Sequence, residues 1–191
     1  MTSFGDYLTE SGDNLRRLQA SGIEPQVQAA IVALSAALAA RKPVLVCGNG
    51  GSAADAQHIA GELVGRYERE RVALPVIALA GDAATLTALG NDYGYERVFS
   101  RQVEAHGQPG GVLIGLTTSG RSPNVLRAFE TARSLGVTTI ALTGEGGGPI
   151  AARSDILLAV PSKITARVQE MHICIYHYIC GQVEAAIAGR S

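Results

Sequence analysis

The spacing of apolar residues along the chain changes near residue 43. Before that point apolar side chains recur every three or four residues, which is typical of amphipathic helices. The first predicted helix carries such residues from Phe4 to Leu18. The second opens at Pro25, because proline is tolerated in the first turn of a helix. We therefore predict an N-terminal helical segment over about residues 1–41.

After Pro43 the pattern becomes an alternation of short, β-branched apolar runs and helical segments. The apolar runs are Val44–Cys47, Val76–Leu79, Val112–Leu116, Thr138–Leu142 and Ile156–Val160. The helical segments lie near Ala53–Gly65, Ala83–Gly90, Tyr95–Ala105, Pro123–Leu135 and Pro149–Ala152. Runs of this kind separated by helices predict parallel strands buried on both faces. The expected fold is a doubly wound α/β domain, with a five-stranded parallel sheet flanked by helices and ligands at the carboxyl ends of the strands.

The last predicted helix, Thr165 to Ile187, is apolar around almost its whole circumference. Such a helix is expected to be buried on all sides. A subunit interface is the simpler explanation in a chain of 191 residues, and a central helix lying on its own sheet is the alternative. No second domain or linker is apparent, so residues 1–191 are interpreted as one domain.

Charge and composition exclude several classes of function. The chain has 16 Lys plus Arg and 17 Asp plus Glu, with no run of basic residues, so no broad nucleic-acid surface is expected. Residues Met1 to Asp6 do not resemble a signal peptide, and the most apolar segment, Val27–Ala40, is too short to cross a bilayer. Cys174 and Cys180 lie about 240° apart around a helix and cannot pair. We therefore expect a cytoplasmic protein with no membrane partner.

The first predicted strand runs into a glycine-rich loop, Gly48-Asn49-Gly50-Gly51-Ser52, with a helix starting at Ser52 or just after it. Glycines allow close approach of the backbone to a ligand, and the uncapped N–H groups of a helix start attract anions. The Ser52 hydroxyl adds a further donor. Alone, this signal is weak, because the loop also fits the dinucleotide-binding pattern G-x-G-x-x-A.

A second loop of the same character follows the third predicted strand. It reads Thr117-Thr118-Ser119-Gly120-Arg121-Ser122-Pro123 and again leads into a helix. Its hydroxyls and backbone donors suit one compact dianion, although Ser122 as a simple helix cap and glycines as a simple turn remain alternatives. A dinucleotide site would need an acidic residue about 20 positions after the glycines, whereas Asp82 comes some thirty residues on. Two such loops at one end of a sheet favour a phosphate ester.

Candidates for proton transfer or metal binding lie on two helices. His58 and Glu62 are four residues apart and share a face. Gln169 and His177 lie about 80° apart on the last helix and face one side, whereas His172 points about 140° from His177. A carboxylate and an imidazole suit an aldose–ketose isomerisation. Each candidate also has a purely structural interpretation. His58 and Glu62 suit an ordinary surface pair. A histidine on an apolar helix suits a core or interface position, which is the interpretation favoured for His172.

Several motifs, taken together and in order, resemble the sedoheptulose 7-phosphate isomerases of the SIS (sugar isomerase) fold. They are Cys47-Gly48-Asn49-Gly50-Gly51-Ser52, the helix with His58 and Glu62 ending in Gly65-Arg66-Tyr67, Gly90-Asn91-Asp92, Thr118-Ser119-Gly120, Leu142-Thr143-Gly144 and Val168-Gln169-Glu170-Met171-His172. The resemblance runs from about Thr9 to Ile187. It implies a homotetramer that converts sedoheptulose 7-phosphate to D-glycero-D-manno-heptose 7-phosphate, the first step towards activated heptose for lipopolysaccharide core or related glycans.

The resemblance also implies roles for individual residues. Glu62 and His177 match the catalytic carboxylate and imidazole of the family. The matching substrate-binding residues are Asn49, Gly50, Gly51, Ser52, Glu62, Asn91, Asp92, Thr117, Thr118, Ser119, Ser122 and Gln169. His58, Glu62, Gln169 and His177 match the ligands with which some members bind zinc, one ion per chain. A metal-free mechanism through Glu62 and His177 is the competing interpretation. Arg121 stands where relatives commonly have asparagine.

The main rival function is non-enzymatic. A paralogous branch of the same fold binds the bacterial replication initiator protein and shares the glycine loop and the Gln-Glu-Met-His segment. That branch lacks the carboxylate and the imidazole at the positions of Glu62 and His177, both of which this chain has. Phosphosugar-sensing transcription regulators would need a DNA-binding segment, and none is visible before the core. The sequence therefore favours the enzyme.

Overall fold

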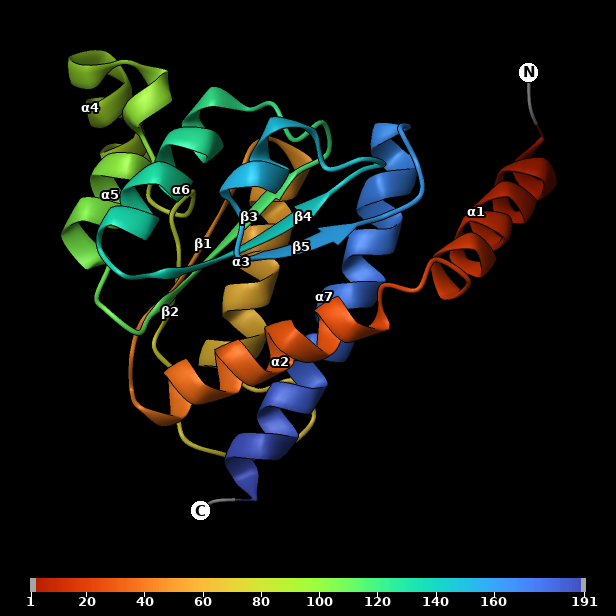
Figure 1. The fold of residues 1–191 in the computed structure, drawn as a ribbon, viewed down its shortest axis with the longest axis horizontal. Helices are drawn as coiled ribbons and strands as arrows, with labels where there is room; N and C mark the ends of the chain where they lie inside the picture. Colours follow the sequence, from red (N-terminus) through yellow and green to blue (C-terminus); the bar gives the residue numbers. More distant parts are fainter. Residues whose placement is uncertain (1–2, 190–191) are drawn as a thin grey trace.

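A five-stranded parallel sheet forms the centre of the molecule in the computed structural model, which describes residues 3–189 (Figure 1). The strands are β1 (Val44–Gly48), β2 (Val76–Ala78), β3 (Val112–Thr117), β4 (Thr138–Thr143) and β5 (Ile156–Ala159). Their order is β2-β1-β3-β4-β5, the doubly wound arrangement that the sequence predicts. The bounds predicted for the domain, 1 and 191, lie outside the described residues.

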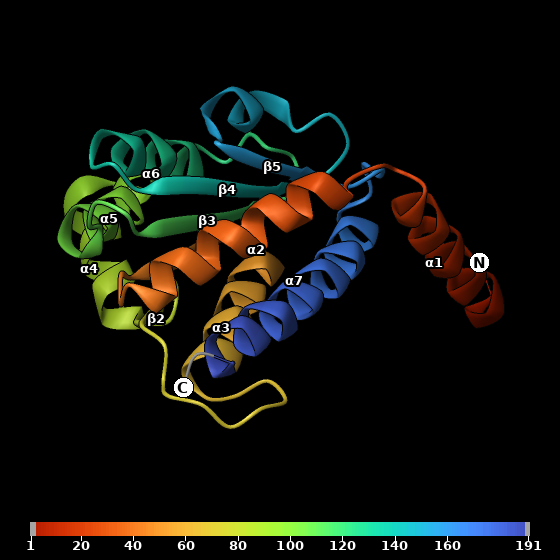
Figure 2. The same ribbon diagram turned by 60° about the horizontal axis from the view of Figure 1, so that its bottom comes forward.

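Helices cover both faces of the sheet (Figures 1 and 2). On one face lie α2 (Glu24–Ala39), α3 (Gly51–Val64) and α7 (Thr165–Ala188). On the other lie α4 (Ala83–Tyr93), α5 (Ser100–His106) and α6 (Pro123–Ser134). Alternate strand residues feed the two cores: Val44 and Val46 pack towards the first face, and Leu45 and Cys47 towards the second. This two-sided burial explains why the strands read as continuous apolar runs.

Local sequence signals set several helix starts. The side chain of Asp82 accepts hydrogen bonds from Ala84 N and Thr85 N and so caps α4. Proline stands in the first turn of both α2 and α6, where its missing N–H costs nothing. Helix α1 (Phe4–Gln19) begins with a capping box between Ser3 and Asp6.

Three helical segments differ from their prediction. The predicted helix Tyr95–Ala105 is interrupted: a 3₁₀ turn, η1 (Tyr95–Arg97), precedes α5, which begins only at Ser100. Val98 and Phe99 lie between them, and both are completely buried, so the chain bends there to place consecutive side chains in the core. The predicted segment Pro149–Ala152 is also a 3₁₀ helix, η2 (Gly148–Arg153). Helix α4 continues to Tyr93, where Gly94 with a φ of 81° ends it.

Most of α7 is buried by its own chain. It packs against α2, α3 and the first core, which accounts for apolar residues such as Val168, Met171 and Ile179. Cys174 and Tyr178 remain exposed. The alternative of a central helix lying on its own sheet therefore explains most of the apolar surface of α7. The surface at Cys174 and Tyr178 is not covered by the chain itself.

No single helix among residues 3–189 is both long enough and apolar enough to cross a membrane. Helices α1 and α2 pass that test only as a pair, and they meet at a bend of 79°. The three cysteines, Cys47, Cys174 and Cys180, are all free thiols, as the sequence predicts for the last two.

Candidate functional site

The two hydroxyl- and glycine-rich loops begin side by side at the carboxyl edge of the sheet. Strands β1 and β3 are neighbours, with Gly48 in register with Leu116. The chain order of the strands reverses between these two, so this is the topological switch point at which doubly wound folds bind ligands. The loops after β1 and β3 therefore flank one ligand position.

The loop after β1 presents the start of α3 without a side-chain cap. Gly50 adopts a φ of 57° and occupies the N-cap position, where it has no side chain to bond the first N–H groups. Gly48 approaches the backbone of Ser52 so closely that an added Cβ would lie 2.5 Å from Ser52 O. The Ser52 side chain is buried in the same turn. The positive end of the helix dipole and a hydroxyl at a helix N-terminus without a side-chain cap suit an anion.

The loop after β3 concentrates hydroxyl groups. Thr117 Oγ1 and Ser122 Oγ lie 3.0 Å apart, and Ser119 Oγ accepts a hydrogen bond from Arg121 N at 3.2 Å. Ser122 stands at the N-cap of α6, yet its hydroxyl makes no capping bond to that helix. The Ser122 side chain therefore does not act as a simple helix cap in this structure. Gly120, with a φ of 65°, packs directly on Gly147 O and closes the turn.

A pair of side-chain amides joins the two loops. Asn49 and Asn124 exchange two hydrogen bonds, at 2.9 Å and 2.8 Å. Tyr95 Oη also donates to Asn49 Oδ1 at 3.1 Å. Asn91 and Asp92 are exposed on α4, where the Asn91 amide donates a hydrogen bond to the Asp92 carboxylate at 2.8 Å. The sequence pattern does not reveal Asn124 or Tyr95, because each contacts Asn49 from an element far away in the chain.

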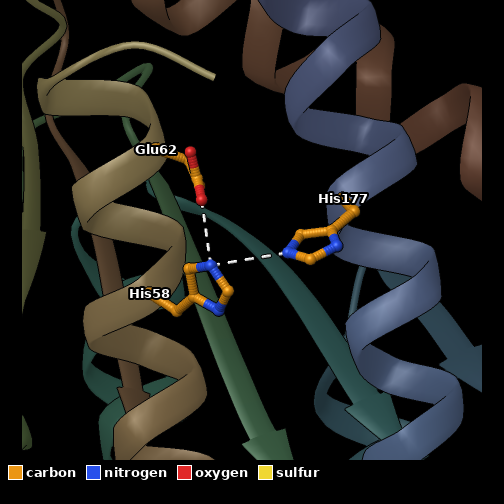
Figure 3. A group of neighbouring side chains, drawn as sticks. All are labelled: His58, Glu62 and His177. Atoms are coloured by element: carbon orange, nitrogen blue, oxygen red, sulfur yellow. Dashed lines mark hydrogen bonds and ion pairs between the residues drawn. The ribbon is translucent and has the colours of Figure 1, made fainter. Parts of the chain in front are cut away.

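The proton-transfer candidates meet between α3 and α7 (Figure 3). His58 Nε2 lies 2.9 Å from Glu62 Oε1 and 3.5 Å from His177 Nε2. Ligand atoms of these three residues all lie within 4.8 Å of one another. The side chains of His58 and Glu62 are 41% and 21% exposed, so a small molecule has access to them. Two imidazoles and a carboxylate at this spacing suit a divalent metal such as zinc.

His58 has further partners that sequence reasoning did not find. Its Nδ1 lies 2.9 Å from Tyr176 Oη, which also lies 3.3 Å from Asp55 Oδ1. Burial raises the pKa of the Asp55 carboxyl, and the hydrogen bond from Tyr176 and the nearby His58 act in the opposite direction. Tyr176 looked like one more apolar position of α7, because a helical pattern does not distinguish a core tyrosine from one that reaches a histidine.

Gln169, the fourth proposed metal ligand, is not beside the other three. A Cβ added at Gly51 would lie 2.6 Å from Gln169 Nε2, so the amide of Gln169 covers the first turn of α3. His58 is seven positions further along that helix, which corresponds to about 10 Å. Gln169 thus faces the anion loop, and His58, Glu62 and His177 form a separate cluster.

His172 is a core histidine, as the sequence predicts. It is fully buried, and its Nε2 lies 3.2 Å from Thr143 O. Burial lowers the pKa of this imidazole to about 4, against the opposing effect of that hydrogen bond. It is therefore uncharged at neutral pH and lies outside the site.

Comparison with known proteins identifies close relatives of this chain. The SIS domain family matches residues 6–144. The chain is 54% identical to the phosphoheptose isomerase of Rhodospirillum rubrum over 163 residues, covering 85% of this chain and 87% of that protein. It is 48% identical to the phosphoheptose isomerase of Burkholderia pseudomallei, over 96% of both chains. A solved phosphoheptose isomerase from Francisella tularensis superimposes with a TM-score of 0.92 at 40% identity, covering 97% of this chain and all of that one.

Proposed function

The chain belongs to the phosphoheptose isomerases of the SIS domain family, and on that premise we propose that its site converts sedoheptulose 7-phosphate to D-glycero-D-manno-heptose 7-phosphate. The observation that carries the proposal is the layout of α3, which begins at the loop after β1 and carries His58 and Glu62 further along, where His177 of α7 meets them. We further propose that the product enters activated-heptose synthesis in the cytoplasm.

The proposed chemistry needs a base and a proton carrier. The Glu62 carboxylate removes a proton from C1 of the ketose and returns it to C2 of the enediol. The His177 imidazole moves a proton between O1 and O2. Positioned general acids and bases contribute about 10²–10⁴-fold to such steps. Atoms balance within the substrate, so no co-reactant is required.

The spacing of the two parts of the site suits a long sugar phosphate. Ser52 and His58 are six positions apart on α3, or about 9 Å along its axis. Seven bonds separate C2 from phosphorus in a 7-phosphate, and at about 1.2 Å of extension per bond they span about 8 Å. A phosphate held at the loops therefore places the reacting carbons near His58 and His177.

The direct test is product formation. Purified protein incubated with sedoheptulose 7-phosphate is expected to yield an aldoheptose 7-phosphate, detected by the aldehyde-derived anomeric proton signals. Failure to form it would overturn the proposed function. The rival function, binding of a replication initiator, is less well supported, because this chain holds a carboxylate and an imidazole together in its site.

Substrate anchoring gives a second expected result. Ser119→Ala should raise KM for the sugar phosphate about 10- to 100-fold, since a hydrogen bond to a charged group contributes about 1.5–3 kcal/mol. Unphosphorylated sedoheptulose should be a very poor substrate. Ser134→Ala, at the far end of α6, is the matched control. Equal activity on both sugars would remove the phosphate-loop argument.

We also propose one divalent cation, zinc, per chain at His58, Glu62 and His177, with Gln169 as a fourth ligand once its side chain turns away from Gly51. The donor set and its spacing support the site. A bound cation would polarise the ketose carbonyl as a Lewis acid. The metal-free scheme through Glu62 and His177 remains the alternative that the experiments must separate.

A homotetramer is the proposed assembly. Helix α1 projects from the body of the molecule (Figure 1) and exposes Phe4 and Leu8 at 75% and 53%. Beside it an apolar groove of about 290 Å³ runs between α1, α2 and α7, with the exposed Tyr178 on its wall. Large exposed apolar areas mark association surfaces. Four identical chains most often assemble with dihedral symmetry.

Light scattering at micromolar concentration is expected to give the mass of four chains. Leu8→Lys should shift the mass towards smaller species, because it places a charge in the contact, whereas Arg127→Lys on α6 should not change it. An active wild-type monomer at that concentration would contradict the proposed assembly.

A further inference from the structure

The catalytic imidazole proposed above has an aromatic neighbour from the loop after α3. The rings of Tyr67 and His177 lie with centroids 5.6 Å apart and planes inclined by 38°. His58 and Tyr176 meet the same imidazole edge-on, at 4.9 Å and 5.0 Å. The terminal torsion of histidine is intrinsically broad, so ring contacts of this kind determine where His177 Nε2 points.

A glycine in α7 makes room for the Tyr67 ring. An added Cβ at Gly181 would lie 3.3 Å from Tyr67 Cε1 and 3.5 Å from Cδ1. Gly181 stands one turn after His177, on the same side of the helix. Glycine inside a helix lowers its stability relative to alanine. The ring of Tyr67 thus occupies space that is fully open only because residue 181 is glycine.

A buried carboxylate fixes the backbone of Tyr67. Glu184 is fully buried, and its oxygens accept hydrogen bonds from the N–H groups of Tyr67, Glu68 and Arg69, at 2.9, 2.7 and 2.7 Å. Burial acts to raise the pKa of Glu184, but these N–H groups and Arg71 hold it below its usual value. We call Glu184, Arg71 and the three N–H groups the Glu184 latch.

The latch also binds the end of α3. The fully buried Arg71 guanidinium lies 3.5 Å from Glu184 Oε1 and donates to Glu62 O at 2.8 Å and to Gly65 O. The last carbonyls of a helix lack partners within it, and a cation there is favourable. One buried ion pair therefore joins the helix that carries Glu62 to the helix that carries His177.

We propose that Tyr67 is a positioning residue for the His177 imidazole, seated in the slot at Gly181 and held there by the Glu184 latch. The proposal rests on the proposed function for the role of His177. The aromatic ring, and not the hydroxyl, is the acting part, because the contact is ring to ring. Its effect is on turnover, since the phosphate loop after β1 lies at the other end of α3, about four turns away.

Four single variants test the proposal. Tyr67→Leu should lower kcat about 2- to 10-fold, the range of an aromatic pair, with KM within about twofold. Tyr67→Phe keeps the ring and should stay within about twofold of wild type. Gly181→Ala should lower kcat like Tyr67→Leu. Gly61→Ala is its matched control, because an added Cβ at this exposed α3 glycine meets nothing within 4 Å. Both alanines gain helix propensity, so instability does not explain a difference between them.

A measurement without substrate separates this inference from the proposed function. In protein labelled with ¹⁵N-histidine, the ring signals of His177 should shift in Tyr67→Leu and Gly181→Ala and stay in place in Gly61→Ala. A wild-type protein without isomerase activity would remove the function but leave this test intact. Unchanged His177 signals and kcat in Tyr67→Leu and Gly181→Ala would overturn the inference. So would a loss in Tyr67→Phe as large as in Tyr67→Leu.

Discussion

Replacing Glu62 by glutamine is expected to lower turnover by at least about 100-fold while the protein stays folded. The introduced glutamine would still offer an amide oxygen to His58 Nε2, the partner of the carboxylate at 2.9 Å. What the variant loses is the ability to accept a proton from carbon. The expected loss is therefore in kcat, with KM and the melting temperature close to those of the wild type.

The matched control is Glu24→Gln, at an exposed position of α2 where an amide can keep the hydrogen bond from Gln28. Steady-state rates at saturating sedoheptulose 7-phosphate and circular dichroism on both variants make the comparison. Near-wild-type turnover in Glu62→Gln would eliminate this carboxylate as the base. An equal loss in Glu24→Gln would show that the assay reports something other than proton transfer.

The sheet and its helices were predictable because burial leaves a direct trace in the sequence. Strands such as Val112–Thr117 are covered on both faces, so each is a short apolar run. The break between η1 and α5 left no such trace. Val98 and Phe99 read as helical positions, but both side chains are buried in the same core, on the face of the sheet that α4, α5 and α6 cover.

The candidate site was predictable in part for a similar reason. His58 and Glu62 are near in sequence, so helical spacing alone brings them together. For Gln169 and His177 the helical wheel gives direction around the axis but ignores distance along it, and eight positions amount to about 12 Å. Tyr67 and Tyr176 reach the histidines across the gap between α3 and α7, which no local pattern encodes.

The role of His58 divides the two mechanisms more sharply than any other residue. In the metal-free scheme only Glu62 and His177 transfer protons, and His58 merely donates a hydrogen bond to the carboxylate. In the metal scheme His58 is one of three clustered ligands. Loss of Lewis-acid polarisation costs several kcal/mol, so His58→Ala is expected to lower turnover by at least about 10²-fold. His106→Ala, at the exposed end of α5, should leave turnover unchanged.

Metal content must be followed in the same preparations, because loss of the hydrogen bond to Glu62 would also lower turnover to some extent. Wild-type protein stripped with a chelator should lose activity and regain it in proportion to added zinc, up to about one ion per chain by mass spectrometry. His58→Ala should bind zinc more weakly and stay impaired after its addition. Full activity in wild-type protein proven free of metal would make the cation dispensable. Since the carboxylate that binds the cation is also the proposed base, a supported metal site would further require Glu62 to leave the cation during turnover, and zinc affinity should then fall when substrate is bound.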